Sequence, residues 1–181
     1  ECSPAPLTMI FQKTDALPYE TTGGLDSVPR RMPSHPVALE LIRAAGGFVA
    51  APSANISGRP SPTCAEHVEK DLADRIDMIV DGGSVGIGLE STVVGFTEEE
   101  PTILRPGYLD QEMLSGILGE VSLDPGVLSE DSKVRPKAPG MRYRHYAPKA
   151  QLVVVEGSTE RVVDRINQLA AQHREQGCRA G

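Results

Sequence analysis

The sequence has no tryptophan, only 4% aromatic residues and three cysteines among 181 residues. Cys2, Cys64 and Cys178 form no Cys-x-x-Cys pair, so neither a zinc site nor a disulfide scaffold is indicated, and a reducing compartment fits best. No apolar run approaches the ~20 residues that a membrane span requires. The first residues lack the basic and apolar regions of a signal peptide. We therefore expect a cytoplasmic protein that makes no membrane contact.

Several chemical patterns are also missing. Lysine and arginine number 18 against 25 aspartate and glutamate residues, and the resulting net charge of −7 argues against a protein that binds nucleic acid by neutralising phosphates. The four histidines lack the spacing of a zinc site, and no serine lies in a Gly-x-Ser-x-Gly motif. The sequence therefore indicates neither a metal held by side chains nor a hydrolase with a catalytic triad.

Hydrophobic periodicity predicts strands that alternate with helices. Apolar or β-branched stretches indicate strands at residues 6–12, 48–51, 77–81, 91–96 and 102–104, with a short extended segment at 27–32. Helical patterns cover residues 35–45, 63–73 and 110–118. Thr63 and Glu66 are spaced as a capping box for the second helix, and Asp110 is placed to cap the third. We therefore expect a first α/β domain over residues 1–119.

The composition changes after residue 119. The next twenty residues are rich in Pro, Ser, Asp and Gly and show no periodicity, so we expect an interdomain linker over residues 120–149. Residues 151–156 then predict a strand, and residues 158–176 predict an amphipathic helix. Because one strand and one helix cannot bury a core alone, we interpret residues 150–181 as the start of a second α/β domain.

One loop carries groups that suit a nucleotide. A predicted buried strand leads into residues 50–63, where three serines, an asparagine and backbone N–H groups are free to bind phosphates and a sugar. The polar residues are Ser53, Asn55, Ser57 and Ser61. A solvent-exposed turn rich in Ser, Pro and Gly is the alternative interpretation.

Two further segments surround the predicted hairpin. The glycine-rich segment 82–93 leads to Ser91 but contains no complete phosphate loop, so a simple hairpin turn explains it equally well. In ILRPG, residues 103–107, Arg105 ends a strand and its planar guanidinium is placed to reach an anion. A surface arginine in a turn is the alternative.

A dense group of cations and aromatic side chains lies in the last part of the predicted linker. The string PGMRYRHYAP at residues 139–148 contains Arg142, Tyr143, His145 and Tyr146. Such a group either stacks on a base and covers phosphates, or docks the linker onto the first domain.

In this order, the motifs resemble those of the YrdC-like family, and in particular its two-domain threonylcarbamoyl-AMP synthases. The matching strings are SVPRRMP at 27–33, APSANISGRPSPT at 51–63, DGG at 81–83, ESTV at 90–93, ILRPG at 103–107 and PGMRYRHYAP at 139–148. The similarity extends from about residue 4 to residue 156. It implies a twisted open α/β sheet of the YrdC-like type with flanking helices, a linker, and the start of a Rossmann-like second domain.

The resemblance also implies an activity. Members of this family act as nucleotidyltransferases that join L-threonine, bicarbonate and ATP into threonylcarbamoyl-AMP and release pyrophosphate. The product supplies a downstream tRNA-modifying transferase complex, which places the threonylcarbamoyl group on an adenosine next to the anticodon. Mg²⁺ is then expected with ATP, held through the phosphates rather than by a protein cage. For tRNA itself we expect a weak contact.

Each site residue is carried over from a matching motif. The resemblance places Arg31, Ala51 and Ser91 beside threonine, and Arg105 on the phosphates as the catalytic residue. On the ATP side it places Ser27, Ser53, Asn55, Ser61, Arg105, Arg142, Tyr143, His145 and Tyr146, the last four as a lid.

The sequence departs from the family pattern near its first residue. The family's domain begins with a strand that recognises threonine and with a Lys-x-Arg pair, and neither precedes Pro4. We therefore expect an N-terminally truncated chain that by itself binds weakly or does not turn over. Ser27 stands where the family usually has threonine, and the hydroxyl is kept.

Two alternatives belong to other classes. The first is a non-catalytic nucleotide- or RNA-binding module of the same fold, which a salt titration of tRNA binding would separate from an enzyme. The second is a carbamoyl-transfer maturation enzyme, but the cysteine pairs and the acylphosphatase-like part of such proteins are not found in this sequence.

Overall fold

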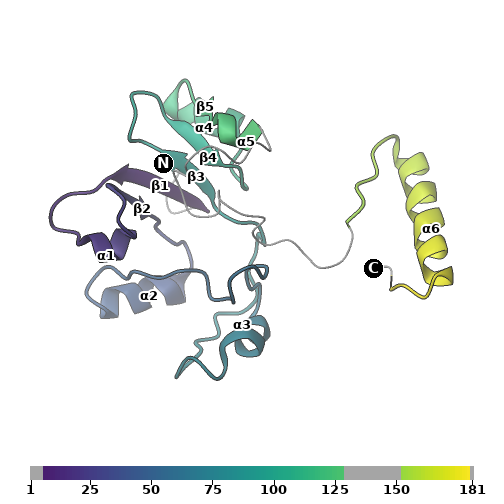
Figure 1. The fold of residues 1–181 in the computed structure, drawn as a ribbon, viewed down its shortest axis with the longest axis horizontal. Helices are drawn as coiled ribbons and strands as arrows, with labels where there is room; N and C mark the ends of the chain where they lie inside the picture. The colour runs from purple at the N-terminus through teal and green to yellow at the C-terminus, as the bar shows by residue number, and fades with distance from the viewer. Residues whose placement is uncertain (1–5, 129–151, 180–181) are drawn as a thin grey trace. The chain divides into compact units, whose positions relative to one another are not determined.

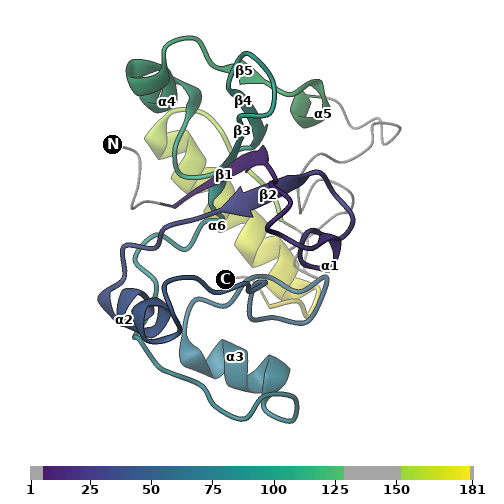
Figure 2. The same cartoon turned by 90° about the vertical axis from the view of Figure 1, so that its left-hand side faces the viewer.

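The computed structural model describes residues 6–128 and 152–179. The chain forms two compact units, Glu1–Ala147 and Pro148–Gly181 (Figure 1). The first unit contains a sheet of five strands in the order β2-β1-β3-β4-β5, which can be followed in Figure 2. The strands are β1 (Leu7–Gln12), β2 (Ser27–Arg30), β3 (Thr92–Gly95), β4 (Thr102–Arg105) and β5 (Ser122–Leu123).

The sheet is mixed. Strand β1 pairs parallel to β3, and β4 pairs parallel to β5, whereas β1–β2 and β3–β4 are antiparallel. The predicted open α/β sheet is confirmed, and so are the strands expected near residues 6–12, 91–96 and 102–104. The hairpin between β3 and β4 has a register irregularity between Val93 and Val94.

Alternating residues of β1 divide the core between the two faces of the sheet. On one face Leu7, Val94 and Ile103 pack with Leu114 of α4 (Gln111–Leu118) and with Val121. On the other face Ile10, Val93 and Leu104 form a smaller apolar cluster. That second face also carries the polar residues described below, because Thr8 and Gln12 lie at the same parity as Ile10.

Helix α4 forms where the local signals predict it. The Asp110 carboxylate accepts a hydrogen bond from the Met113 amide at 2.8 Å, and Gly119 ends the helix with a positive φ of +84°. The other helices are α1 (Tyr19–Thr22), α2 (Pro36–Ala44), α3 (Ala65–Leu72), α5 (Pro125–Leu128) and α6 (Thr159–Glu175). Within the described ranges, no helix combines the length and apolarity needed to cross a bilayer.

Two predicted strands do not form. Residues 48–51 and 77–81 have no strand structure, and the side chains of Phe48 and Met78 are 86% and 78% exposed. A strand depends on hydrogen bonds to a neighbouring strand, and the described sheet provides no pairing partner for either segment. Residues 152–156 of the second unit are likewise not a strand, and Gln151 lies outside the described residues.

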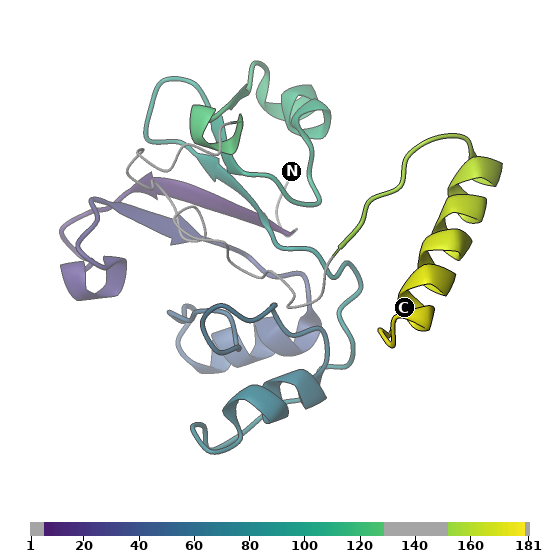
Figure 3. The same cartoon turned by 45° about the vertical axis from the view of Figure 1, so that its right-hand side comes forward.

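The connection between β2 and β3, shown in Figure 3, differs in detail from the prediction. Helix α2 confirms the pattern at 35–45, but α3 begins after Cys64 rather than Thr63. The capping box is therefore wrong, because Glu66 occupies the second helical position and not the third. Instead, the Thr63 hydroxyl lies 3.3 Å from His67 Nδ1.

Residues 120–128 are part of the folded first unit. Strand β5 pairs with β4, Val121 and Asp124 are only 3% exposed, and α5 follows directly. The linker pattern therefore does not describe this part of the chain, because its few apolar residues are used in the sheet. The domain limits at 119/120 and 149/150 stay predictions.

Candidate functional site

Two motifs distant from β1 in the sequence meet it on the second face of the sheet. Register pairs Thr8 with Val93, which places the Thr8 side chain next to the residue that precedes β3, Ser91. The two hydroxyl oxygens are 2.8 Å apart, and Ser91 is only 5% exposed. The second residue of β1 and the residue just before β3 are therefore joined by one hydrogen bond.

Arg105 at the end of β4 holds the same serine. Its Nε and Nη2 atoms donate to the Ser91 carbonyl oxygen at 3.2 and 2.8 Å, and Nη2 also donates to the Ser91 hydroxyl at 3.1 Å. Glu90 Oε2 lies 3.8 Å from Nη2. Among the described residues Nη1 has no hydrogen-bond partner, so the guanidinium is oriented by the protein and keeps one nitrogen for an anion.

A close backbone approach supports this cluster. A Cβ atom at Gly107 would lie 2.5 Å from both the Glu90 carbonyl oxygen and the Thr92 amide. The buried Thr92 hydroxyl donates to the Leu109 carbonyl oxygen at 2.8 Å and accepts from the Leu109 amide at 3.0 Å. The turn after β4 is therefore fixed against the start of β3, where Ser91 lies.

The serine-rich loop is held by its own hydrogen bonds. Asn55 Nδ2 donates to the carbonyl oxygens of Ile56 and Arg59, at 3.1 and 3.0 Å. Asn55 Oδ1 and the Ser61 hydroxyl are buried, and neither has a hydrogen-bond partner among the residues that the structure describes. Buried polar atoms normally have partners, so these two oxygens are the strongest indication that the loop receives a ligand or water.

Asp71 of α3 ties this loop to the helix. Its side chain is 10% exposed, pairs with the Arg59 guanidinium and accepts from the Ile56 amide at 3.3 Å. Burial raises the pKa of Asp71, but hydrogen bonds from Arg59 and Ile56 and the nearby positive charges outweigh burial and lower the pKa below its ordinary value.

The pH dependence of the loop follows from this direction. Because the pKa of Asp71 is lowered in the folded protein, the carboxylate stabilises the loop above its ordinary pKa of about 4, and this contribution is lost as the pH falls through the lowered value. We expect amide protection of residues 56–59 to be constant from neutral pH down to about pH 5 and to fall in stronger acid.

Hydrogen exchange of Asp71→Asn measures this effect. The variant should exchange faster in the loop at neutral pH, whereas the matched control Asp74→Asn, an exposed position just after α3, should not. Unchanged protection in Asp71→Asn would show that the loop is held by its internal hydrogen bonds alone.

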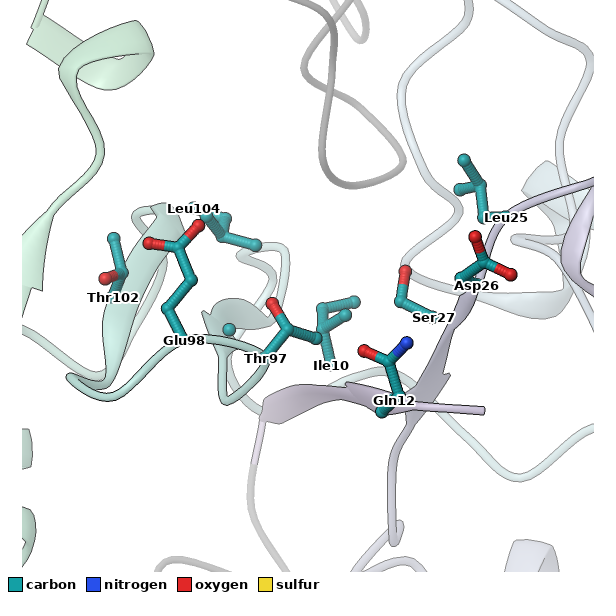
Figure 4. Close-up of a pocket in the computed structure, with 10 residues that line it drawn as sticks. Ile10, Gln12, Leu25, Asp26, Ser27, Thr97, Glu98, Thr102 and Leu104 are labelled. Atoms are coloured by element: carbon teal, nitrogen blue, oxygen red, sulfur yellow. The ribbon is translucent and has the colours of Figure 1, made fainter. Parts of the chain in front are cut away.

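A cavity of about 370 Å³ lies at the opposite end of the same face. Figure 4 shows Gln12 of β1 and Ser27 of β2 side by side at its edge, with Thr97 and Glu98 across from them. Ile10, Gly95 and Leu104 provide its apolar part. The face therefore has a charged end at Arg105 and an apolar pocket with a polar edge near Ser27.

The structure brings together only part of the predicted site. Ser91 and Arg105 are in direct contact, and Asn55 and Ser61 belong to one loop. Arg31, Ala51 and Ser53 are exposed, and no hydrogen bond or ion pair between described residues joins them to Arg105. Their roles stay predictions. Arg142, Tyr143, His145 and Tyr146 lie outside the described residues.

Thr8 and Gly107 were missed at the sequence level. The alternation in LTMIFQ predicts that Thr8 shares a face with Ile10, but nothing local indicates which residue it meets. Gly107 belongs to a motif that was recognised, but its own role becomes visible only from the backbone that lies against it.

Two protein-family models match this chain. The family model described as telomere recombination, named after Sua5, YciO and YrdC, matches residues 1–107. The chain belongs to the Sua5/YciO/YrdC family. A second model, described as the C-terminal domain of threonylcarbamoyl-AMP synthase, matches residues 109–181. The predicted family resemblance is confirmed.

Individual family members agree with this assignment. A threonylcarbamoyl-AMP synthase of Pyrococcus abyssi is 48% identical over 178 residues, covering 98% of this chain and 52% of the relative. One from Bacillus subtilis is also 48% identical, covering 98% of this chain and 50% of the relative. The crystal structure of P. abyssi Sua5 complexed with L-threonine matches with a TM-score of 0.86 and 47% identity, covering 97% of this chain and 51% of that one. The chain thus spans about half the length of these relatives.

Proposed function

We propose that the whole protein is a threonylcarbamoyl-AMP synthase, which joins L-threonine, bicarbonate and ATP into threonylcarbamoyl-AMP. The observation that carries this proposal is the 48% identity to the P. abyssi synthase over nearly the whole chain. The Ser91–Arg105 cluster of this chain supports it. The product would supply a downstream transferase complex that modifies tRNA next to the anticodon. The cytoplasm is the compartment in which we place this reaction.

The chemistry suits the groups that the structure presents. The threonine amine and bicarbonate form a carbamate with loss of water, and a carbamate oxygen then attacks the α-phosphorus of ATP and expels pyrophosphate. This step depends on positioning and on neutralising negative charge, and it requires no covalent nucleophile from the protein. A fixed guanidinium, hydroxyls and an amide are the appropriate side chains.

The two ends of the polar face suggest how the substrates lie. Thr8 and Gln12 are about 13 Å apart along β1, at roughly 3.3 Å per residue. We place the amino acid at the Ser91 end and the nucleotide toward the pocket beside Ser27, with the phosphates near Arg105. The remaining assignments are Arg31 and Ala51 for threonine, and Ser53, Asn55, Ser61, Arg142, Tyr143, His145 and Tyr146 for ATP.

Magnesium fits this arrangement as a partner of ATP. In the described part of the chain, no group of three or more His, Cys, Asp or Glu side chains is placed to hold a metal ion. The unpartnered oxygens of Asn55 and Ser61 are neutral, and such a set suits an ion that keeps waters and phosphate oxygens as its main ligands. When bound, Mg²⁺ would neutralise charge on the phosphates.

A pyrophosphate assay on the whole protein tests the proposal. We expect pyrophosphate release from ATP only when L-threonine and bicarbonate are both present, because the carbamate is the attacking group. Release that does not depend on threonine would contradict the amino-acid assignment. ATP binding without any release would favour the non-catalytic nucleotide-binding module instead.

A further inference from the structure

Thr8 is a polar residue of β1 that lies between the buried residues Leu7 and Ile10. Its neighbours on the same face are Ile10 and Val93, both at most 3% exposed, yet its hydroxyl is directed to the Ser91 hydroxyl at 2.8 Å. Thr8 and Ser91 are 83 residues apart in the sequence. The contact therefore exists only because β1 and β3 pair in this register.

The Thr8 and Ser91 hydroxyls have two protons between them, and one of these is not used in the hydrogen bond that joins them. A hydroxyl has one donor and can accept twice, whereas arginine can only donate. Arg105 Nη2 donates to the Ser91 oxygen at 3.1 Å, and one of the two hydroxyl protons forms the Thr8–Ser91 bond. Whichever residue donates in that bond, the hydroxyl proton of the other stays available to an acceptor outside the pair.

The positive charge of Arg105 favours an anionic oxygen as the acceptor of the remaining hydroxyl proton. The Arg105 guanidinium donates to the Ser91 oxygen, and such a bond strengthens the donor character of the hydroxyl that receives it. The unpartnered Nη1 of Arg105 belongs to the same group. An available hydroxyl proton beside a guanidinium nitrogen is complementary to an anionic oxygen.

We infer that Thr8 is a positioning residue for the amino-acid substrate, an inference that rests on the proposed function. Thr8 holds the Ser91 hydroxyl on Arg105, and the pair donates its remaining proton to an anionic oxygen of threonine. Without the Thr8 hydroxyl, the Ser91 proton is free to rotate toward other acceptors, and the orientation of the donor is lost.

Valine at position 8 tests the inference, since it keeps the β-branched shape and removes only the hydroxyl. In the whole protein we expect Thr8→Val to raise the KM for threonine about tenfold, the size of one hydrogen bond to a charged group. The KM for ATP should be unchanged. Thr8→Ser should retain a KM close to that of the wild type, because the hydroxyl is restored. Thr14→Val, at an exposed position, is the matched control.

Other results would overturn the inference. An unchanged KM for threonine in Thr8→Val would exclude a role in binding. An equal rise in the KM values for threonine and for ATP, together with a lower melting temperature, would show a purely structural role. If Thr8→Val does not fold, Thr8→Ser provides the test. A raised KM for threonine in Thr8→Ser would contradict the inference, because this variant keeps the hydroxyl. A wild-type protein without threonine-dependent pyrophosphate release would instead refute the proposed function, and this inference with it.

Discussion

Arg105→Ala is expected to lower kcat/KM for threonylcarbamoyl-AMP formation by about 10²–10³-fold, equivalent to about 3–4 kcal/mol of transition-state stabilisation. The reason lies in its geometry. Hydrogen bonds from Arg105 Nε and Nη2 to the Ser91 carbonyl oxygen orient the guanidinium before any ligand arrives, and Nη1 stays available to an anion. A charge donor fixed in advance costs no reorganisation when negative charge moves to the leaving pyrophosphate. Steady-state kinetics of the whole protein measure the effect.

Two further variants separate charge from geometry. Arg105→Lys keeps the positive charge but not the planar fork, so we expect only partial recovery of activity. Arg75→Ala removes an exposed arginine just after α3 and should have no effect. If Arg105→Ala and Arg75→Ala show the same kinetics, Arg105 has no place in the site. A melting curve of each variant shows whether loss of the Ser91 contacts also destabilises the fold.

Gly107→Ala is expected to destabilise the protein by about 1–3 kcal/mol and to reduce activity at the same time. The added methyl group would lie 2.5 Å from backbone atoms of Glu90 and Thr92, and 2.8 Å from the Ser91 carbonyl carbon. Backbone cannot rotate away as a flexible side chain can, so the start of β3 must shift. That shift would move Ser91 away from Arg105. Urea unfolding and the pyrophosphate assay measure the two losses.

Gly116→Ala is the matched control, with an effect of opposite sign. Gly116 lies inside α4, and a Cβ there would meet no atom within 4 Å. Alanine should therefore stabilise the helix by about 0.5–1 kcal/mol. A Gly107→Ala protein as stable as the wild type would show that the turn relaxes without moving β3.

The correct sequence predictions depend on interactions between residues close together in the chain, whereas the incorrect ones depend on partners that are distant in the chain. Helix α4 was predicted with its ends because Asp110 and Gly119 act on adjacent backbone, and α6 follows from one amphipathic stripe. The apolar segments at 48–51 and 77–81 looked equally strand-like, but their structure depends on pairing partners elsewhere. Apolar character alone cannot provide those hydrogen bonds.

For the candidate site, the motif strings pointed to Ser91 and Arg105 but not to the residues that hold them, and the roles of both stay predictions. The motif strings mark polar and charged residues, and Ser91 and Arg105 are in direct contact in the structure. Thr8 carried no such mark, because threonine in a strand is common. Its contact with Ser91 requires that two strands far apart in the chain pair at one register and no other.

The amino-acid sequence by itself determined the family, the α/β class, the ends of α4, and the identity of two residues at the polar end of the sheet. Only the tertiary structure decided that Thr8, Ser91 and Arg105 share one hydrogen-bonded chain, and that Gly107 has no room for a side chain. The physical reason is that caps and periodicity act between near neighbours, whereas strand register and backbone approach result from packing the whole sheet at once.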